Sequence, residues 1–332
     1  MLEYKMITPE QKAEALRRKS RRGKYRAIWP ETRSFTGWVV KEVQRKFSNL
    51  KLVPGLRIPI TLEVVSQWNA ERSLAQALRR RRFGNVDAGF VTMAKDGRVV
   101  LMIGGRNFGK NQFNTVTTAQ RQPASTFKPF VFLTAFQRGS AKPSLTLTKA
   151  LARSDNEIVV RLAKKAGPGH VIKTARRLGI KSRLRAKNNI ALGASEVNLL
   201  ELTRAYAAFA SGGWRADEAY GFRGLVQNGR VHYWRRPRGR ERVIKRTDAQ
   251  SMQSMLRRVV THGSGRPARR IKGAAGKTGT TDDNRDGWFV GYTPRHVSGL
   301  WLGRLDNRPV RGLDGTAASA VWAAIEKALP RE

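Results

Sequence analysis

Three short stretches of the chain carry side chains that could work together as a nucleophile and its base. In RQPASTFKPF, at 121–130, Ser125 comes three residues before Lys128. Residues i and i+3 share a helix face, so the lysine can reach the serine hydroxyl if a helix begins here. Lysine can replace histidine as the base once burial or a second cation lowers its pKa. Alone, this spacing is common and also fits an ordinary helix start with an exposed lysine.

The other two stretches are Ser154-Asp155-Asn156 and Lys277-Thr278-Gly279-Thr280. Alone, the first is typical of a turn or a helix cap. The second places a small glycine where a ligand or another backbone can approach a strand. Together with the first stretch they give S-x-x-K, S-D-N and K-T-G in the order found in penicillin-recognising enzymes. Their joint occurrence predicts a serine acyl-transfer site.

The elements that must position these residues indicate an α+β fold, an antiparallel β-sheet flanked by helices. Apolar spacing predicts amphipathic helices at 34–47, 66–82, 199–210 and 316–329, with a break at 53–59. Alternation and turn residues predict a short strand at 61–64, a hairpin at 88–105 and a strand pair at 286–294 and 297–305. Because strands are predicted near both ends of the chain and helices between them, we expect one domain in which helices pack on a sheet.

Composition narrows the class further. The 332 residues include no cysteine and only four scattered histidines, so we expect no metal and no cofactor. No stretch is apolar enough to span a membrane, and no signal peptide follows Met1, so we expect no export or anchoring signal in this chain. We expect residues 1–55 to form a basic linker or pedestal and residues 56–332 to form the main domain.

The net charge of +41 predicts attraction to polyanions. Most of these charges suit an ordinary solvated surface, but the runs Arg17–Arg22 and Arg79–Arg82 are dense. No nucleic-acid-binding motif accompanies them, so we expect no specific nucleic acid partner. Contact with an anionic membrane or a cell-wall polymer is the preferred interpretation of the basic surface.

Longer stretches carry a family resemblance. FNTVTTAQRQPASTFKPFVFLTAF, ALGASEVNLLELTRAYAAFASGG and GKTGTTDDNRDGWFVGYTP are similar to the transpeptidase domain of class A penicillin-binding proteins. The resemblance covers most of the chain and implies a peptidoglycan D,D-transpeptidase, a member of the superfamily that also contains serine β-lactamases. The implied partners are peptidoglycan stem peptides with D-Ala-D-Ala ends, an acceptor amine, and β-lactams. The presumed parent protein would act in the periplasm, at the extracytoplasmic face of the cell membrane.

The resemblance also implies roles for individual residues. Ser125 would attack the penultimate D-alanyl carbonyl, and Lys128 would take its proton. Ser154 would pass a proton to the leaving D-alanine, while Asn156 would hold Lys128 and the substrate amide. The substrate-binding set would be Lys277, Thr278, Gly279 and Thr280, with the Lys277 charge lowering the pKa of Lys128. The backbone N–H groups of Ser125 and Thr280 would form the oxyanion hole.

The chain departs from the family pattern at three points. No glycosyltransferase signature is present. Ser125 and Ser154 are only 29 residues apart, shorter than in longer relatives, so part of the groove wall is expected to be missing. Ala124 stands where a glycine is usual, and we expect this change to be tolerated.

Two alternative functions follow from the same residues. A D,D-carboxypeptidase or β-lactamase on this fold would need a base for water, and Glu196 is the acidic candidate, although a structural role suits it better. A catalytically silent penicillin-binding remnant would fit the shortened segment and the missing glycosyltransferase.

Overall fold

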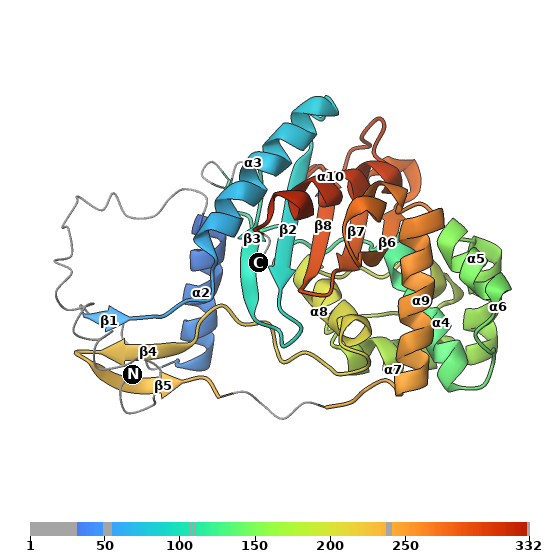
Figure 1. Cartoon of the computed structure of the whole chain (residues 1–332), viewed down its shortest axis with the longest axis horizontal. Helices are drawn as coiled ribbons and strands as arrows, with labels where there is room; N and C mark the ends of the chain where they lie inside the picture. Colours follow the sequence, from blue (N-terminus) through green and yellow to red (C-terminus); the bar gives the residue numbers. More distant parts are fainter. Residues whose placement is uncertain (1–31, 49–54, 107, 109–110, 237–240, 331–332) are drawn as a thin grey trace.

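The computed structural model describes residues 32–48, 55–106, 108, 111–236 and 241–330. Figure 1 shows a central sheet with helices on both sides and a small separate sheet at one end. The basic run at Arg17–Arg22 lies outside the described residues. Within the described ranges, no helix is both long and apolar enough to cross a membrane, and no group of potential metal ligands is present.

The central sheet has five antiparallel strands in the order β3-β2-β8-β7-β6. The strands are β2 (Asp87–Met93), β3 (Val99–Ile103), β6 (Ala275–Thr280), β7 (Asp286–Tyr292) and β8 (Val297–Gly303). Successive residues point to opposite faces, so Phe90 lies in one core and Val91 in the other. The predicted hairpin and the predicted strand pair are confirmed, as is the α+β fold class.

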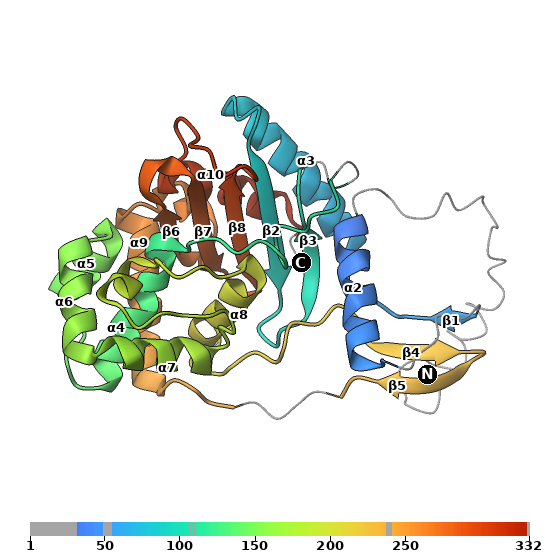
Figure 2. The ribbon, with the colours of Figure 1, turned by 180° about the vertical axis from the view of Figure 1, so that it is seen from behind.

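Different helices cover the two faces of this sheet, as Figures 1 and 2 show from opposite sides. Helices α3 (Val64–Arg80) and α10 (Gly315–Ala328) pack together over one face. Helix α8 (Leu199–Ala210) packs against β2, β7 and β8 on the other face. Both faces are therefore buried, which explains the nearly continuous apolar runs of the strands.

A helical lobe adjoins the edge strand β6. It contains α4 (Lys128–Gln137), α5 (Leu145–Arg153), α6 (Asn156–Ala166), α7 (Pro168–Leu178) and α9 (Arg246–His262). Short 3₁₀ turns lie along the described part of the chain: η2 (Ala124–Phe127) before α4, η3 (Asn188–Leu192) between α7 and α8, η4 (Arg266–Arg270) between α9 and β6, and η5 (Asp282–Asn284) between β6 and β7. The lobe places the connection between α5 and α6 opposite β6, with η2 beside it.

A second sheet contains β1 (Leu56–Arg57), β4 (Gly224–Gln227) and β5 (Arg230–Trp234) in the order β1-β4-β5. Helix α2 (Arg33–Lys46) lies between this small sheet and β3. Its residues Phe35, Val39 and Val43 are buried in the main core. The division at residue 55 stays a prediction, and the described part of the first segment packs as part of the main body.

The strand predicted at 61–64 is wrong. Thr61, Leu62 and Glu63 are extended without forming a strand, and Val64 begins α3. The Thr61 hydroxyl and the Glu63 N–H bond to the carbonyls of Val99 and Val100 on β3, which anchors the start of the helix instead of adding a strand. Val65 is 64% exposed on α3, so its β-branched side chain reflects surface placement rather than strand pairing.

Candidate active site

Ser125 lies on the 3₁₀ turn η2, and α4 follows directly at Lys128. The predicted helix start near Ser125 is confirmed, and Pro129 occupies the first turn of α4, where the missing N–H costs no helical bond. The turn is fixed from two sides: Thr126 Oγ1 donates to the Pro123 carbonyl at 2.5 Å, and the buried Tyr206 hydroxyl on α8 donates to the Thr126 carbonyl at 2.6 Å. Ser125 itself is half-buried.

Ala124 has a φ of +47°, a backbone conformation that favours glycine. This accounts physically for the glycine that the family resemblance leads one to expect there. Gly193, after η3, packs directly on this turn, because a Cβ at Gly193 would lie 2.3 Å from the Ala124 carbonyl oxygen. The left-handed conformation at position 124 is thus held by close backbone packing.

The Ser154-Asp155-Asn156 stretch forms the junction between α5 and α6. Ser154 ends α5 with a left-handed φ of 62°, and Asp155 caps α6 by accepting from the Ile158 N–H at 2.8 Å. A non-glycine residue in this conformation costs energy and is often found at functional positions. The result turns the side chains of Ser154 and Asn156 toward the base of α4.

Lys128 is fully buried and points at this junction. Its Nζ donates to the Asn156 Oδ1 at 2.6 Å, to the Ser154 carbonyl at 2.6 Å, and to the Ser154 Oγ at 3.2 Å. Within the described residues, no hydrogen bond joins Lys128 to the Ser125 hydroxyl. The structure therefore brings Lys128, Ser154 and Asn156 together, with Ser125 one turn away on the same segment.

Lys277 of β6 is also fully buried, and its Nζ lies 3.1 Å from the Ser154 Oγ. The Ser154 hydroxyl thus stands between two lysine amines. Burial lowers the pKa of Lys128 to about 8, and the charge of Asp155 opposes this shift. Burial also lowers the pKa of Lys277 well below its usual value, and the charge of Lys128 lowers it further. Of the two causes expected from the sequence, burial is the one that lowers the pKa of Lys128, and the Lys277 charge implied by the family resemblance is not among the causes.

Gly279 allows β6 to approach the turn that carries Ser125. A Cβ at Gly279 would lie 2.6 Å from the Pro123 carbonyl oxygen and 3.0 Å from Thr126 Cγ2. The Thr281 N–H donates to Asp286 on β7, so alternation along the strand places the Thr280 N–H on the open edge of β6. Thr280 is half-buried there.

Ser264, between α9 and η4, is a contact that the sequence analysis missed. Its hydroxyl lies 2.5 Å from Thr278 Oγ1, and Thr278 is buried. Tyr206 lies in the helix predicted at 199–210, and no sequence pattern indicated that its hydroxyl would bond to the turn that carries Ser125. Glu196 is exposed, and among the described residues its carboxylate has no hydrogen-bond partner. This leaves it without support as a positioned base.

The chain thus places a half-buried serine beside two buried lysines that share one serine hydroxyl. On an antiparallel sheet with a helical lobe, this is the arrangement of the S-x-x-K class of penicillin-recognising proteins. The family described as "Penicillin binding protein transpeptidase domain" matches residues 88–145 and 140–325, and the chain belongs to this family. The two matched stretches overlap at residues 140–145, within the interval between Ser125 and Ser154 that was predicted to be short.

Named relatives agree with this assignment. Penicillin-binding protein 1A of Neisseria lactamica is 31% identical over 269 residues, which cover 69% of this chain and 34% of that protein. The match to such relatives therefore spans about a third of their length. Among solved structures, penicillin-binding protein 1A of Haemophilus influenzae has a TM-score of 0.79 at 19% identity, covering 98% of this chain and 74% of that one.

A second solved structure is the PonA1 protein of Mycobacterium tuberculosis in complex with penicillin V. It has a TM-score of 0.77 at 22% identity and covers 90% of this chain and 93% of that one. At these identities, the likeness shows that the fold is shared.

Proposed function

We propose that this chain is a serine-type D,D-transpeptidase that cross-links peptidoglycan stem peptides through an acyl-enzyme on Ser125. The observation that carries the proposal is the Ser154 hydroxyl, which lies 3.2 Å from Lys128 Nζ and 3.1 Å from Lys277 Nζ. An acyl transfer needs a base for the nucleophile and a proton for the leaving amine. Two lysines joined by one hydroxyl can supply both.

In the first step, Ser125 Oγ bonds to the carbonyl carbon of the penultimate D-alanine, and its proton passes to the neutral Lys128 amine. With a pKa of about 8, roughly a tenth of Lys128 is neutral at pH 7, compared with less than one in a thousand for an ordinary lysine. The burial that lowers this pKa also keeps the amine fixed against Asn156. The C–N bond to the terminal D-alanine then breaks, and the leaving amine takes a proton through Ser154.

Substrate binding would set the direction of this proton movement. A terminal carboxylate beside Thr278 and Thr280 would raise the pKa of the nearby Lys277, because an opposite charge favours the protonated form. A proton would then be held on Lys277, leaving Lys128 neutral across the shared Ser154 hydroxyl. The two lysines form a coupled pair that titrates as a unit.

The tetrahedral oxyanion would be bound by the backbone N–H groups of Ser125 and Thr280. Within the described residues, neither N–H has a hydrogen-bond partner, and the close approach at Gly279 brings their two segments together. Removing one such donor typically costs about 10²–10³ in rate. The same donors would receive the carbonyl of a β-lactam ring.

The acyl group would then pass to an amine on a neighbouring stem peptide. Asn156 is exposed, and Ser125, Ser154 and Thr280 are half-buried, so an acceptor could reach the ester. Hydrolysis, as in a carboxypeptidase or β-lactamase, needs a positioned water base, and no contact of Glu196 supports that role. Stem peptides and β-lactams are thus the proposed partners, and the proposed site of action is the extracytoplasmic face of the membrane.

The experiment is covalent labelling with penicillin, followed by intact-mass measurement and peptide mapping. We expect one adduct, on Ser125, that outlasts the seconds in which a β-lactamase would clear it. Ser125→Ala should give no adduct, while the matched control Ser140→Ala should label normally. A folded wild-type protein that takes up no penicillin would overturn the proposal and favour a silent remnant.

A further inference from the structure

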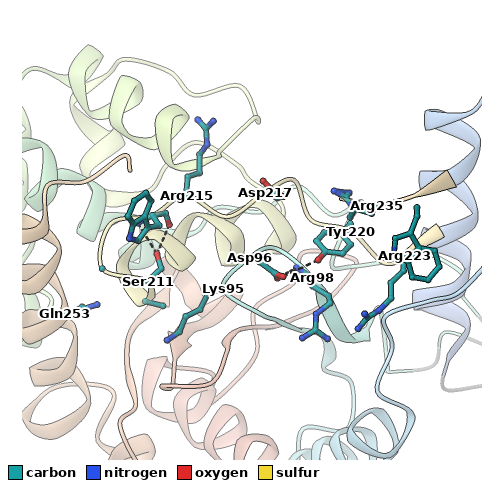
Figure 3. A pocket seen from close by; sticks show the side chains of 14 residues that line it. Lys95, Asp96, Arg98, Ser211, Arg215, Asp217, Tyr220, Arg223, Arg235 and Gln253 are labelled. Atoms are coloured by element: carbon teal, nitrogen blue, oxygen red, sulfur yellow. Dashed lines mark hydrogen bonds between the residues drawn. The ribbon is translucent and has the colours of Figure 1, made fainter. Parts of the chain in front are cut away.

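Figure 3 shows the side chains that line an open cleft of about 860 Å³. Its walls are the β2–β3 turn, the segment that follows α8, and the ends of β4 and β5. The strand register places this cleft at the opposite end of the sheet from Thr280 and so separates the cleft from Ser125. At the cleft end of the sheet, Met93 precedes the β2–β3 turn and pairs with Val297. Asp87 and Gly303 pair at the opposite end, which is the end near Thr280. The cleft is therefore distinct from the candidate active site.

Three cations of this basic cleft have no acidic partner. Within the described residues, no carboxylate lies within ion-pair distance of Lys95, Arg98 or Arg223, and their side chains have no hydrogen-bond acceptor. In Figure 3, Arg98 and Arg223 come from different walls and point to the same side of the view. Lys95 is half-buried, and burial lowers its pKa. An anion would restore the interactions that these groups lack.

Arg235 adds a fourth cation with an unmet hydrogen bond. Its guanidinium stacks 3.9 Å above the ring of Tyr220, and one terminal nitrogen lies 3.8 Å from Glu42. Its Nε is buried and has no hydrogen-bond partner among the residues that the structure describes. The terminal nitrogens of Arg235, rather than this buried Nε, are therefore the atoms that could contact an anion in the cleft.

A neighbouring pocket shows how this chain treats cations that are only structural. That pocket, of about 330 Å³, pairs Lys181 with Glu218 and Arg215 with Glu241. Arg215 and Asp217 line both pockets. In the basic cleft the other carboxylate, Asp96, accepts from the Tyr220 hydroxyl and the Arg98 N–H rather than from a cation. Among the described residues, the smaller pocket is lined by four cations and three carboxylates, whereas the basic cleft is lined by five cations and two carboxylates, so the excess of positive charge is larger in the basic cleft.

The aromatic residues of the cleft are already engaged. Arg242 stacks 4.3 Å from the ring of Trp214, and Trp234 packs on Gly224, where a Cβ would lie 2.4 Å from the indole. Recognition by this cleft therefore depends on charge rather than on ring stacking. Arginine forks bind phosphate oxygens in pairs, and cations on three separate elements suit several negative groups.

We propose that the basic cleft formed by Lys95, Arg98, Arg223 and Arg235 binds an anion that carries two or more phosphate groups. The site does not depend on the proposed transpeptidase chemistry, because it lies away from Ser125 and uses no residue of that site. A phosphate-bearing lipid headgroup and a soluble polyphosphate share this chemistry, and the experiment separates them.

The test is calorimetric titration of the whole chain with inorganic tripolyphosphate. Arg98→Gln combined with Arg223→Gln should weaken binding at least about tenfold, since two charge-assisted contacts are lost. The matched control Arg79→Gln with Arg80→Gln removes the same charge from the exposed end of α3 and should change affinity less than about twofold. Equal weakening by both pairs would overturn the proposal, because it would show non-specific attraction to the charged surface.

Two further measurements test whether each variant is folded and whether the bound phosphate belongs to a soluble molecule or to a lipid headgroup. Thermal unfolding checks that each variant is folded. If the double variant is unfolded, the single variant Lys95→Gln on the β2–β3 turn replaces it and should weaken tripolyphosphate binding a few-fold. Flotation with phosphatidylcholine vesicles, with and without phosphatidate, compares the same variants. Loss of both binding events assigns headgroup access to the cleft, whereas loss of tripolyphosphate binding alone assigns a soluble ligand. Wild-type protein that binds no tripolyphosphate contradicts the site.

Discussion

Two regions of the molecule gather positive charge, and they hold it differently. At the candidate active site, Lys128 and Lys277 are fully buried, and their amines are fixed by Asn156 and Ser154. In the basic cleft, Lys95, Arg98 and Arg223 are partly or fully exposed and have no acidic partner among the described residues. Burial in the first region lowers the proton affinity of both lysine amines, whereas the arginines Arg98 and Arg223 of the second region keep their full charge available to a ligand.

The difference shows how surroundings, rather than residue type, determine what a cation can do. A lysine taken out of water loses its proton more easily and can act as a base. An arginine at the rim of a cleft keeps its proton and can only attract. A chain with 65 lysines and arginines uses only two of them for the proposed chemistry, and packing distinguishes those two.

The largest expected effect comes from Lys128→Met, which keeps the side chain's bulk and removes the amine. The rate of Ser125 acylation by penicillin should fall by about 10²–10⁴, the usual contribution of a general base. Tripolyphosphate binding at the basic cleft should not change. Stopped-flow or gel-based labelling measures the acylation rate. An unchanged rate would show that Lys128 is not the base for Ser125.

Gly279→Ala should have the next largest effect. The new Cβ would lie 2.6 Å from the Pro123 carbonyl oxygen, so β6 must move away from the turn that carries Ser125. A displacement of about 1 Å at a reacting centre can cost about 10² in rate, and we expect a loss of that order in acylation. Gly84→Ala is the control, because a Cβ there meets nothing within 4 Å. Equal acylation rates for the two variants would show that the close approach is not needed.

Salt should separate the two regions directly. Raising the ionic strength from about 0.05 to about 0.5 M shortens the screening length to about 4 Å, which weakens exposed charges far more than buried ones. Tripolyphosphate binding should weaken by about tenfold or more, while penicillin acylation should change only a few-fold. Parallel titration and labelling over the same salt series would show this, and an equal response of both would contradict the distinction.

The smallest effect is expected for Ser264→Ala, which removes the hydroxyl 2.5 Å from Thr278 Oγ1. A neutral hydrogen bond contributes about 0.5–1.5 kcal/mol, so acylation should slow by about twofold to tenfold. Because Thr278 would hold the substrate carboxylate, the half-saturating penicillin concentration should rise by a larger factor than the maximal acylation rate falls. Ser264→Thr should restore the rate, which a purely structural role would not require.

Much of the site could be predicted from the sequence, because each motif carries its own local geometry. Ser125 and Lys128 are linked by helix spacing, and Ser154 to Asn156 by a helix junction. The strand pairs followed from alternation and from the Asp96-Gly97 turn. The three motifs occur in the same chain order as in penicillin-recognising enzymes. This match predicted that segments far apart in the sequence form one site, which the spacing within each motif cannot predict.

Other features depend on contacts that no local pattern records. Ser264 and Tyr206 reach the site across 14 and 80 residues, and each looked like an ordinary turn or core residue. The short strand expected at 61–64 failed because Val64 and Val65 are surface residues of a helix. The basic cleft was not predicted, since its cations are scattered through a chain rich in arginine and lysine.

The most direct test of the account is the pH dependence of Ser125 acylation by penicillin. Burial lowers the pKa of Lys128 to about 8, so the amine is protonated below that pH and becomes a free base above it. The second-order rate should therefore rise with pH and level off above an apparent pKa of about 8. A rate that keeps rising toward the ordinary lysine value near 10.4, or one that does not change between about pH 6 and 10, would contradict a buried lysine base.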